Sequence, residues 1–110
     1  MLFLVYSLDK PATGKEIRRR TRAAHLQYVR DHKSAFVYGG ALLGDSGEMI
    51  GTLAIIKAAD RAALERFLKG DPYHIERLFE KVIINETRQT LPEAAPGFLD
   101  AEIATAAEQV

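Results

Sequence analysis

The chain has 110 residues, of which 47% are hydrophobic and 27% charged, so it fits one globular domain and is too apolar to be disordered. Its 15 Lys and Arg residues balance 15 Asp and Glu residues, and this zero net charge argues against a general attraction to nucleic acid or to acidic membranes. The absence of cysteine excludes disulfides, thiolate metal sites and a cysteine nucleophile, and it suits a cytoplasmic protein.

The first half of the chain begins with a strand and a helix. Residues 2–8 are a short apolar run with aromatic and branched side chains, which predicts a strand rather than a signal peptide. Turn residues follow at 9–14, and residues 15–32 then contain neither Pro nor Gly, which predicts a long helix. No apolar run approaches the roughly 20 residues needed to cross a bilayer, so no membrane association is expected.

A hairpin is predicted next. Residues 35–43 and 49–58 are strand-like, and residues 44–48 supply turn chemistry between them. Gly39 and Gly40 interrupt the first of these strands. Glycine at such a place indicates either a β-bulge or a close approach by a ligand or another backbone.

The second half repeats the alternation of helix and strand. Asp60 is a good N-cap for a helix over residues 61–69, whose apolar stripe includes Leu64 and Leu68, and Gly70 suits its end. Asp71-Pro72 opens a short helical piece, and residues 79–90 predict the last strand.

The resulting order β-α-β-β-α-β predicts an α+β, ferredoxin-like fold with an antiparallel sheet and helices on one face. A sheet with its other face in water alternates apolar and polar residues, whereas three of these strands contain nearly continuous apolar runs. Both faces therefore call for burial. We expect a homodimer in which two sheets pack face to face, a dimeric α+β barrel; the alternative is a monomer that covers the second face with its own tail.

The C-terminal region has a different composition. Residues 1–90 are predicted to form the domain, residues 91–97 a linker, and residues 98–110 a short helix or a disordered tail. Helical spacing brings Leu99, Ile103 and Val110 to one side of that segment.

Two motifs resemble the YciI-like (YCII-related) family: Thr21-Arg22-Ala23-Ala24-His25-Leu26 in the first helix, and Gly70-Asp71-Pro72-Tyr73 after the second. The resemblance extends over residues 1–90. It implies a dimeric α+β barrel related to muconolactone isomerases, with an active site made by a histidine and an aspartate. On the matching positions these are His25 and Asp71. The family includes a dehydrochlorinase that acts on a chlorinated hydroxyquinol, although most members have no assigned reaction.

Two departures from the family pattern stand out. Ala23 occupies a position where the family often has proline. The family also commonly ends its last strand with a proline-aromatic pair, where this chain has residues 85–88, Asn-Glu-Thr-Arg, and this difference alters the expected rim of the pocket.

His25 is the candidate general acid or base, because an unperturbed imidazole titrates near pH ~6.5. Asp71 is expected to accept a hydrogen bond from it and fix its tautomer, as the carboxylate of a catalytic triad does. Plainer interpretations stay open at this stage. A lone histidine on a helix is often only a packed or solvated residue, and an aspartate before proline is often only an N-cap.

Four further residues are candidates for substrate binding. Arg22 lies three residues before His25, near the same helical face, and can hold a carboxylate or phenolate; it is also explained as a surface residue of a basic run. Tyr73 and Tyr6 can line a pocket, although buried tyrosines are common in cores. Gly40 can leave room for a substrate or simply form a bulge.

Other chemistries are disfavoured by the sequence. The signature of an RNA-recognition motif is missing, so no nucleic acid partner is expected. The three histidines have no metal-ligand spacing, and phosphate-loop and dinucleotide patterns are also missing, so neither metal nor cofactor is expected. The leading hypothesis is a cofactor-independent enzyme of the lyase or isomerase type, performing elimination, isomerisation or lactone chemistry on a small organic molecule. The rival is a non-catalytic binding or accessory protein.

Overall fold

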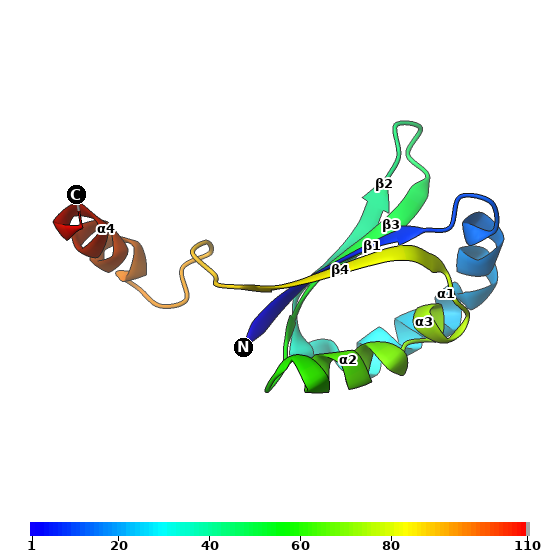
Figure 1. Cartoon of the computed structure of the whole chain (residues 1–110), viewed down its shortest axis with the longest axis horizontal. Helices are drawn as coiled ribbons and strands as arrows, with labels where there is room; N and C mark the ends of the chain where they lie inside the picture. Colours follow the sequence, from blue (N-terminus) through cyan, green and yellow to red (C-terminus); the bar gives the residue numbers. More distant parts are fainter. Residues whose placement is uncertain (110) are drawn as a thin grey trace.

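The computed structural model describes residues 1–109 and forms a four-stranded antiparallel sheet with helices on one face (Figure 1). The sheet has the order β2-β3-β1-β4. The elements, in chain order, are β1 (Leu2–Asp9), α1 (Gly14–Asp31), the 3-10 turn η1 (Lys33–Ala35), β2 (Phe36–Leu43), β3 (Met49–Lys57), α2 (Arg61–Lys69), α3 (Pro72–Ile75), β4 (Phe79–Thr87) and α4 (Phe98–Glu108). The predicted ferredoxin-like α+β fold is confirmed.

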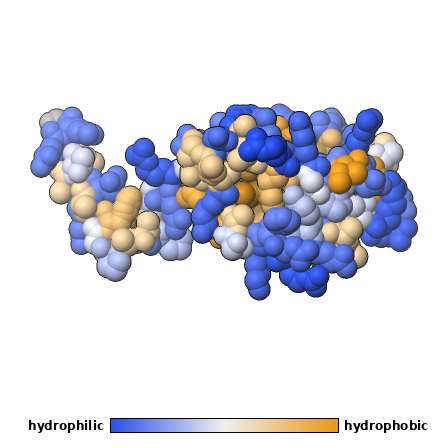
Figure 2. Space-filling model, turned by 90° about the horizontal axis from the view of Figure 1, so that it is seen from below, coloured by the Kyte–Doolittle hydropathy of each residue, from blue (hydrophilic) through white to orange (hydrophobic). Residues whose placement is uncertain are grey.

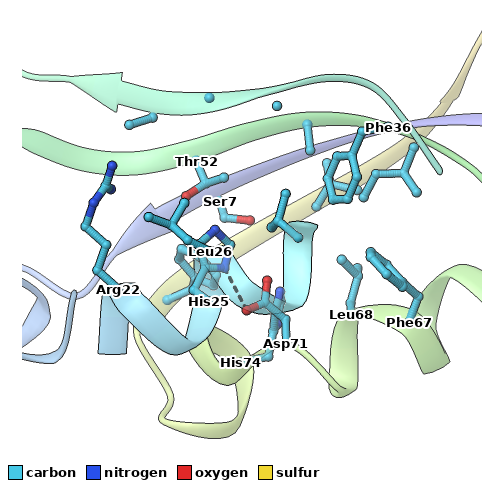
Figure 3. Close-up of a pocket in the computed structure, with 18 of the residues that line it drawn as sticks. Ser7, Arg22, His25, Leu26, Phe36, Thr52, Phe67, Leu68, Asp71 and His74 are labelled. Atoms are coloured by element: carbon cyan, nitrogen blue, oxygen red, sulfur yellow. Dashed lines mark hydrogen bonds and ion pairs between the residues drawn. The ribbon is translucent and has the colours of Figure 1, made fainter. Parts of the chain in front are cut away.

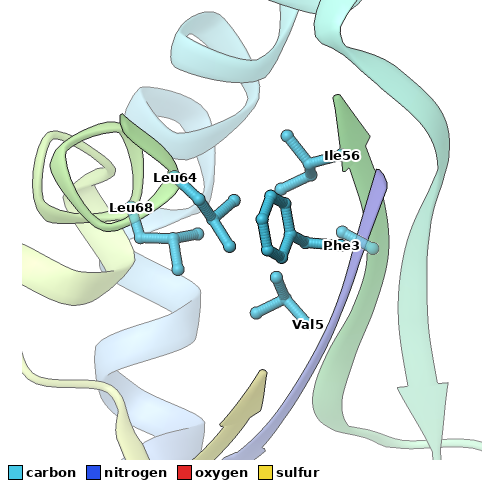
Figure 4. Close-up of a cluster of buried hydrophobic side chains, with 6 residues drawn as sticks. Phe3, Val5, Ile56, Leu64 and Leu68 are labelled. Carbon is cyan, nitrogen blue, oxygen red and sulfur yellow. The ribbon is translucent and has the colours of Figure 1, made fainter. Parts of the chain in front are cut away.

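The core lies between the sheet and the helices. Side chains alternate along β1, so Phe3 and Val5 point to the helices and are buried. They meet Ile56 of β3 and, from α2, Leu64 and Leu68 (Figure 4). The apolar stripe predicted for α2 is therefore the stripe that faces the core. Asp60 begins this helix as predicted, because its Oδ1 accepts a hydrogen bond of 2.8 Å from the backbone N–H of Ala63.

The opposite face of the sheet is also apolar. The residues of β1 that alternate with the buried ones are Leu2, Leu4 and Tyr6. Tyr6 is opposite Leu53 on β3 and Ile83 on β4. No helix of residues 1–109 covers this face in Figure 1, so the chain itself does not provide the second layer.

Two details of the strands differ from the sequence prediction. The strand predicted for residues 79–90 ends at Thr87 because Thr87 is opposite Leu2, where β1 begins, and the ladder has no partner beyond it. Gly39 and Gly40 are not themselves a bulge, since they pair in register with Ala54 and Leu53. A Cβ on Gly40 would lie 2.8 Å from the hydroxyl of Tyr38, the end of an exposed side chain that can move aside.

Beyond β4 the chain leaves the body of the molecule. Residues 88–97 form an arm, and α4 lies apart from the sheet and the other helices (Figures 1 and 2). The helix predicted for the tail is present, although Val110 lies outside the described residues. Within residues 1–109, no helix combines the length and hydrophobicity required to cross a bilayer.

Candidate active site

A histidine and an aspartate that are distant in the sequence meet between α1 and α3. His25 lies on α1, and Asp71 is the N-cap of α3, with Pro72 in the first turn. The Nδ1 atom of His25 is 2.8 Å from Oδ1 of Asp71 (Figure 3). The side chains are 12% and 13% exposed, so the pair is largely screened from water but remains accessible.

The hydrogen bonds around Asp71 fix the tautomer of the His25 imidazole. Its Oδ1 accepts from the ring of His25 and also, at 3.0 Å, from the backbone N–H of Tyr73. An ionised carboxylate can only accept hydrogen bonds, so Nδ1 of His25 donates. In the neutral ring Nε2 then carries the lone pair and can take a proton from a bound molecule.

Tyr73 holds the imidazole from behind. Its ring is stacked on that of His25, with centroids 3.8 Å apart and planes inclined by 12°. Tyr73 is fully buried, so it supports the histidine and does not line the cavity, contrary to the sequence-based prediction. Burial raises the pKa of the Tyr73 hydroxyl, an effect that the charge of Arg18 opposes.

Arg18 completes this support. Its guanidinium lies 4.8 Å from the centre of the Tyr73 ring and donates to the Tyr73 hydroxyl at 3.4 Å. It also forms a two-point ion pair with Asp9, at 2.7 and 2.9 Å, and donates to Thr52 at 3.1 Å. Burial disfavours the charge of Arg18, but the hydrogen bonds and charge of Asp9 outweigh it and raise the pKa of the guanidinium.

A cavity of about 420 Å³ opens beside the pair, between α1, α3 and the helix-facing side of the sheet. Much of its wall is apolar, and Figure 3 shows Phe36, Phe67 and Leu68 at the end away from Arg22. Its lining consists of Val5, Ser7, Arg18, Arg22, His25, Leu26, Val29, Lys33, Phe36, Gly39, Gly40, Ala41, Thr52, Ala54, Ile56, Phe67, Leu68, Asp71, His74 and Phe79.

The charged groups of the cavity are mostly cationic. Arg22 and Lys33 lie on its wall, and neither belongs to an ion pair among the described residues. The Nη1 of Arg22 lies 3.2 Å from the sulfur of Met49, a weak acceptor that leaves its charge unneutralised. Among residues 1–109, Asp71 is the single carboxylate in the lining, so the cavity favours an anionic ligand.

The structure brings together four of the six residues predicted from the sequence. His25, Asp71, Arg22 and Gly40 line one cavity. Tyr6 is not among them, because side chains alternate along β1 and Tyr6 lies on the face away from the helices. The prediction that Tyr6 lines this pocket is wrong for the single chain.

Sequence reasoning missed several residues of the site. Ser7 and Thr52 place hydroxyls on the sheet side of the cavity, and His74 lies in its lining (Figure 3). A signal for Ser7 was present, since it continues the inward-facing series of Phe3 and Val5 with a polar residue. Burial lowers the pKa of His74, partly opposed by the charge of Asp71.

Comparisons with known proteins agree with this fold. The YCII-related domain matches residues 1–88. The structure is similar to 5-chloro-2-hydroxyhydroquinone dehydrochlorinase (TftG) from Burkholderia phenoliruptrix AC1100 in complex with 2,5-dihydroxybenzoquinone. The sequences are 31% identical, the TM-score is 0.75, and the match covers 81% of this chain and 95% of that one.

A more distant similarity concerns PA3566 from Pseudomonas aeruginosa, with 16% identity and a TM-score of 0.48. That match covers 80% of this chain and 91% of the other. No curated protein sequence matches the chain significantly.

Proposed function

This chain belongs to the YCII-related family, and we propose that it is a cofactor-independent enzyme that moves protons on a small organic molecule, with His25 as acid and base. The observation that carries the proposal is the 2.8 Å contact between His25 and Asp71 at the wall of a cavity. The similarity to a dehydrochlorinase supports small-molecule chemistry of this kind.

In the proposed reaction, Nε2 of His25 takes a proton from the substrate. The electron pair left behind forms a new double bond and expels a leaving group such as chloride, which is an elimination. Alternatively, the protonated histidine returns the proton to a different atom, which is an isomerisation. Asp71 orients the ring and stabilises its positive charge during the transfer.

The proposed substrate is a small, largely apolar ring that carries an anionic oxygen. Apolar walls such as those of Phe36 and Phe67 fit the ring. Arg22 lies three residues before His25 on α1 and is proposed to bind the oxygen and to neutralise negative charge that grows there. A chlorinated hydroxyquinol has these features, and TftG is named for acting on one.

Two substitutions of Asp71 separate its roles. Asp71→Ser retains a good helix cap but is too short to reach His25, whereas Asp71→Asn keeps the cap and a neutral acceptor. Losing a hydrogen bond to a charged group, worth about 1.5–3 kcal/mol, slows turnover by about 10- to 150-fold if it stabilises the transition state. We expect Asp71→Ser to show this loss with nearly unchanged stability, and Asp71→Asn to show a smaller loss.

The assay follows chloride release from chlorinated hydroxyquinols and ring opening of lactones. His25→Ala is expected to abolish turnover, and Arg22→Ala to raise KM and to lower kcat. His32→Ala and Arg19→Ala are the matched controls, because both residues are exposed on or beside α1 and lie outside the cavity lining. Turnover that survives both His25→Ala and Asp71→Ser would overturn the mechanism. Tight binding of 2,5-dihydroxybenzoquinone, together with no turnover of any chlorinated hydroxyquinol or lactone, would favour a binding protein instead.

We also propose that the protein is a homodimer that packs two sheets face to face. The apolar outer face, centred on Tyr6, Leu53 and Ile83, supports this arrangement because a sheet face of this kind requires a second layer. Light scattering is expected to give twice the mass of one chain for the wild type. For Leu53→Lys we expect the mass of a single chain. The exposed substitution Arg61→Glu, on the far side of α2, serves as the control. A wild-type mass of one chain would refute the dimer.

A further inference from the structure

The tail has a charge opposite to that of the domain. Residues 89–110 contain four acidic residues and no Lys or Arg, which leaves 15 basic and 11 acidic residues in positions 1–88. The tail lies beyond the matched family region, which ends at residue 88. An acidic segment on a basic domain is attracted to basic surface, whether on its own chain or on another copy.

Helix α4 also carries an apolar stripe that the sheet and the other helices of residues 1–109 do not cover (Figure 1). Leu99 and Ile103 are four residues apart, Ala106 continues their line, and Ile103 is 64% exposed. Asp100 and Glu102 lie on the two flanks of this stripe by helical geometry. Figures 1 and 2 show α4 as a separate lobe, with hydrophobic as well as hydrophilic residues at its surface.

A complementary stripe runs from α1 into η1 at the rim of the cavity. Leu26 and Val29 form its apolar centre, and Arg22 and Lys33 its ends, all four in the cavity lining. Leu26 is 47% exposed and Val29 is partly exposed, so apolar surface is open at the rim of the cavity. The stripe extends over about 16 Å, as does α4, at 1.5 Å per helical residue.

The proposed dimer brings the tail of one copy to this stripe on the other. When two sheets stack about a two-fold axis parallel to their strands, the β4 edge of one copy lies beside the β2 edge of its partner.

The register fixes which ends meet. Thr87, the last residue of β4, is opposite Leu2, and Phe36, the first residue of β2, is at the same end of the sheet. The arm therefore leaves β4 near the start of the partner's β2, across a sheet spacing of about 10 Å. Residues 88–97 can extend over about 33 Å, which is enough to reach α1 on the outer side. Figure 1 shows the arm continuing outward from β4 and not folding back over its own helices.

We propose that α4 of each subunit packs on the Arg22–Lys33 stripe of its partner and covers the mouth of the partner's cavity. The apolar stripe centred on Ile103 meets Leu26 and Val29, and an acidic flank of α4 faces Lys33, which leaves Arg22 free to bind an anionic ligand inside the cavity. This proposal rests on the proposed dimer but not on the catalytic role of His25.

Engineered disulfides test the contact directly, because the native chain has no cysteine. Ile103→Cys and Leu26→Cys are made as separate proteins, mixed, and oxidised at low micromolar concentration. We expect a disulfide-linked pair on non-reducing gels. The control pairs Ile103→Cys with Ile75→Cys, a residue of α3 that is 60% exposed and outside the cavity lining, and we expect little product.

Each outcome discriminates. No excess of the Leu26 product over the control would overturn the proposal. The double variant Leu26→Cys/Ile103→Cys gives a second test. If it forms a fast-migrating monomer with an internal disulfide and no linked pair, α4 lies on its own subunit and the proposal is overturned. The variant truncated after Thr90 is expected to remain a dimer and to release 2,5-dihydroxybenzoquinone at least threefold faster; an unchanged rate would show that α4 does not cover the mouth. Loss of turnover in His25→Ala bears only on the catalytic proposal.

Discussion

The ion pair between Arg18 and Asp9 supports the whole site, and removing one partner gives a sharp prediction. The two side chains are only 7% and 8% exposed and share two short hydrogen bonds. In Arg18→Met, the carboxylate of Asp9 stays buried without its counter-charge. Breaking a buried pair in this way costs about 3–5 kcal/mol, a large part of the stability of a small domain.

Removing both charges is expected to cost less than the sum of the single changes. The double variant Asp9→Asn/Arg18→Met leaves no unpaired charge. We therefore expect its loss of unfolding free energy to be about 2–3 kcal/mol smaller than the sum of the two single losses. Urea unfolding of the four proteins measures this, provided that the slope m is unchanged. Additive effects, within about 0.5 kcal/mol, would refute the account of a buried, mutually dependent pair.

The same double variant separates folding from function. It is expected to recover part of the stability that Arg18→Met loses. The ring of Tyr73 still lacks the guanidinium beside it, a contact worth about 0.5–2 kcal/mol. If that contact keeps His25 in place, turnover falls by about 2- to 30-fold at full folding. Turnover equal to that of the wild type would limit Arg18 to a structural role.

Three further changes test other parts of the structure. Tyr73→Phe loses only a 3.4 Å hydrogen bond and is expected to cost less than about 1 kcal/mol, whereas Tyr73→Leu removes the ring under His25 and costs roughly 2–4 kcal/mol in denaturant unfolding; equal losses would contradict the stacking role. Burial lowers the pKa of His74, so the unfolded chain binds the proton more readily. Stability is then full above about pH 6.5 and decreases as the pH falls through the lowered pKa. Thermal unfolding from pH 7.5 to 5 should show a flatter profile for His74→Phe, and parallel profiles would count against this. Gly51→Ala places a Cβ against the backbone oxygen of Ser7, so we expect a loss of about 1–3 kcal/mol, seen as a lower Tm; an unchanged Tm would contradict the close approach of β1 and β3.

Hydrophobic patterning and capping chemistry were enough to predict the fold. The strand pattern, the apolar stripe of α2 and the Asp60 cap depend on local periodicity and on single hydrogen bonds, which are written in the sequence. The end of β4 is different, because it depends on where the neighbouring strand begins. Such a boundary is set by tertiary pairing and cannot be predicted from one segment alone.

The site was predictable only where the residues carried a motif. His25 and Asp71 were found through family resemblance, and Tyr6 could have been excluded, since period-2 alternation with Val5 puts it on the other face. Arg18 could not be distinguished from its neighbours Arg19 and Arg20 by composition. Helical spacing does place Arg18 on the face of Arg22 and His25, but its ion pair with Asp9 depends on the tertiary fold.

One oxygen atom links the stability of the domain to its proposed chemistry. Oδ1 of Asp71 both caps α3 and accepts from His25, so a change that moves the helix start also moves the histidine. The dyad is therefore constrained by folding as well as by the proposed catalysis. The remaining walls have more freedom, because Arg22 and Lys33 lie outside the ion pairs of the described residues and Leu26 is half exposed. Changes in substrate among related chains are thus expected at this rim and in the tail proposed to cover it, and not at the dyad.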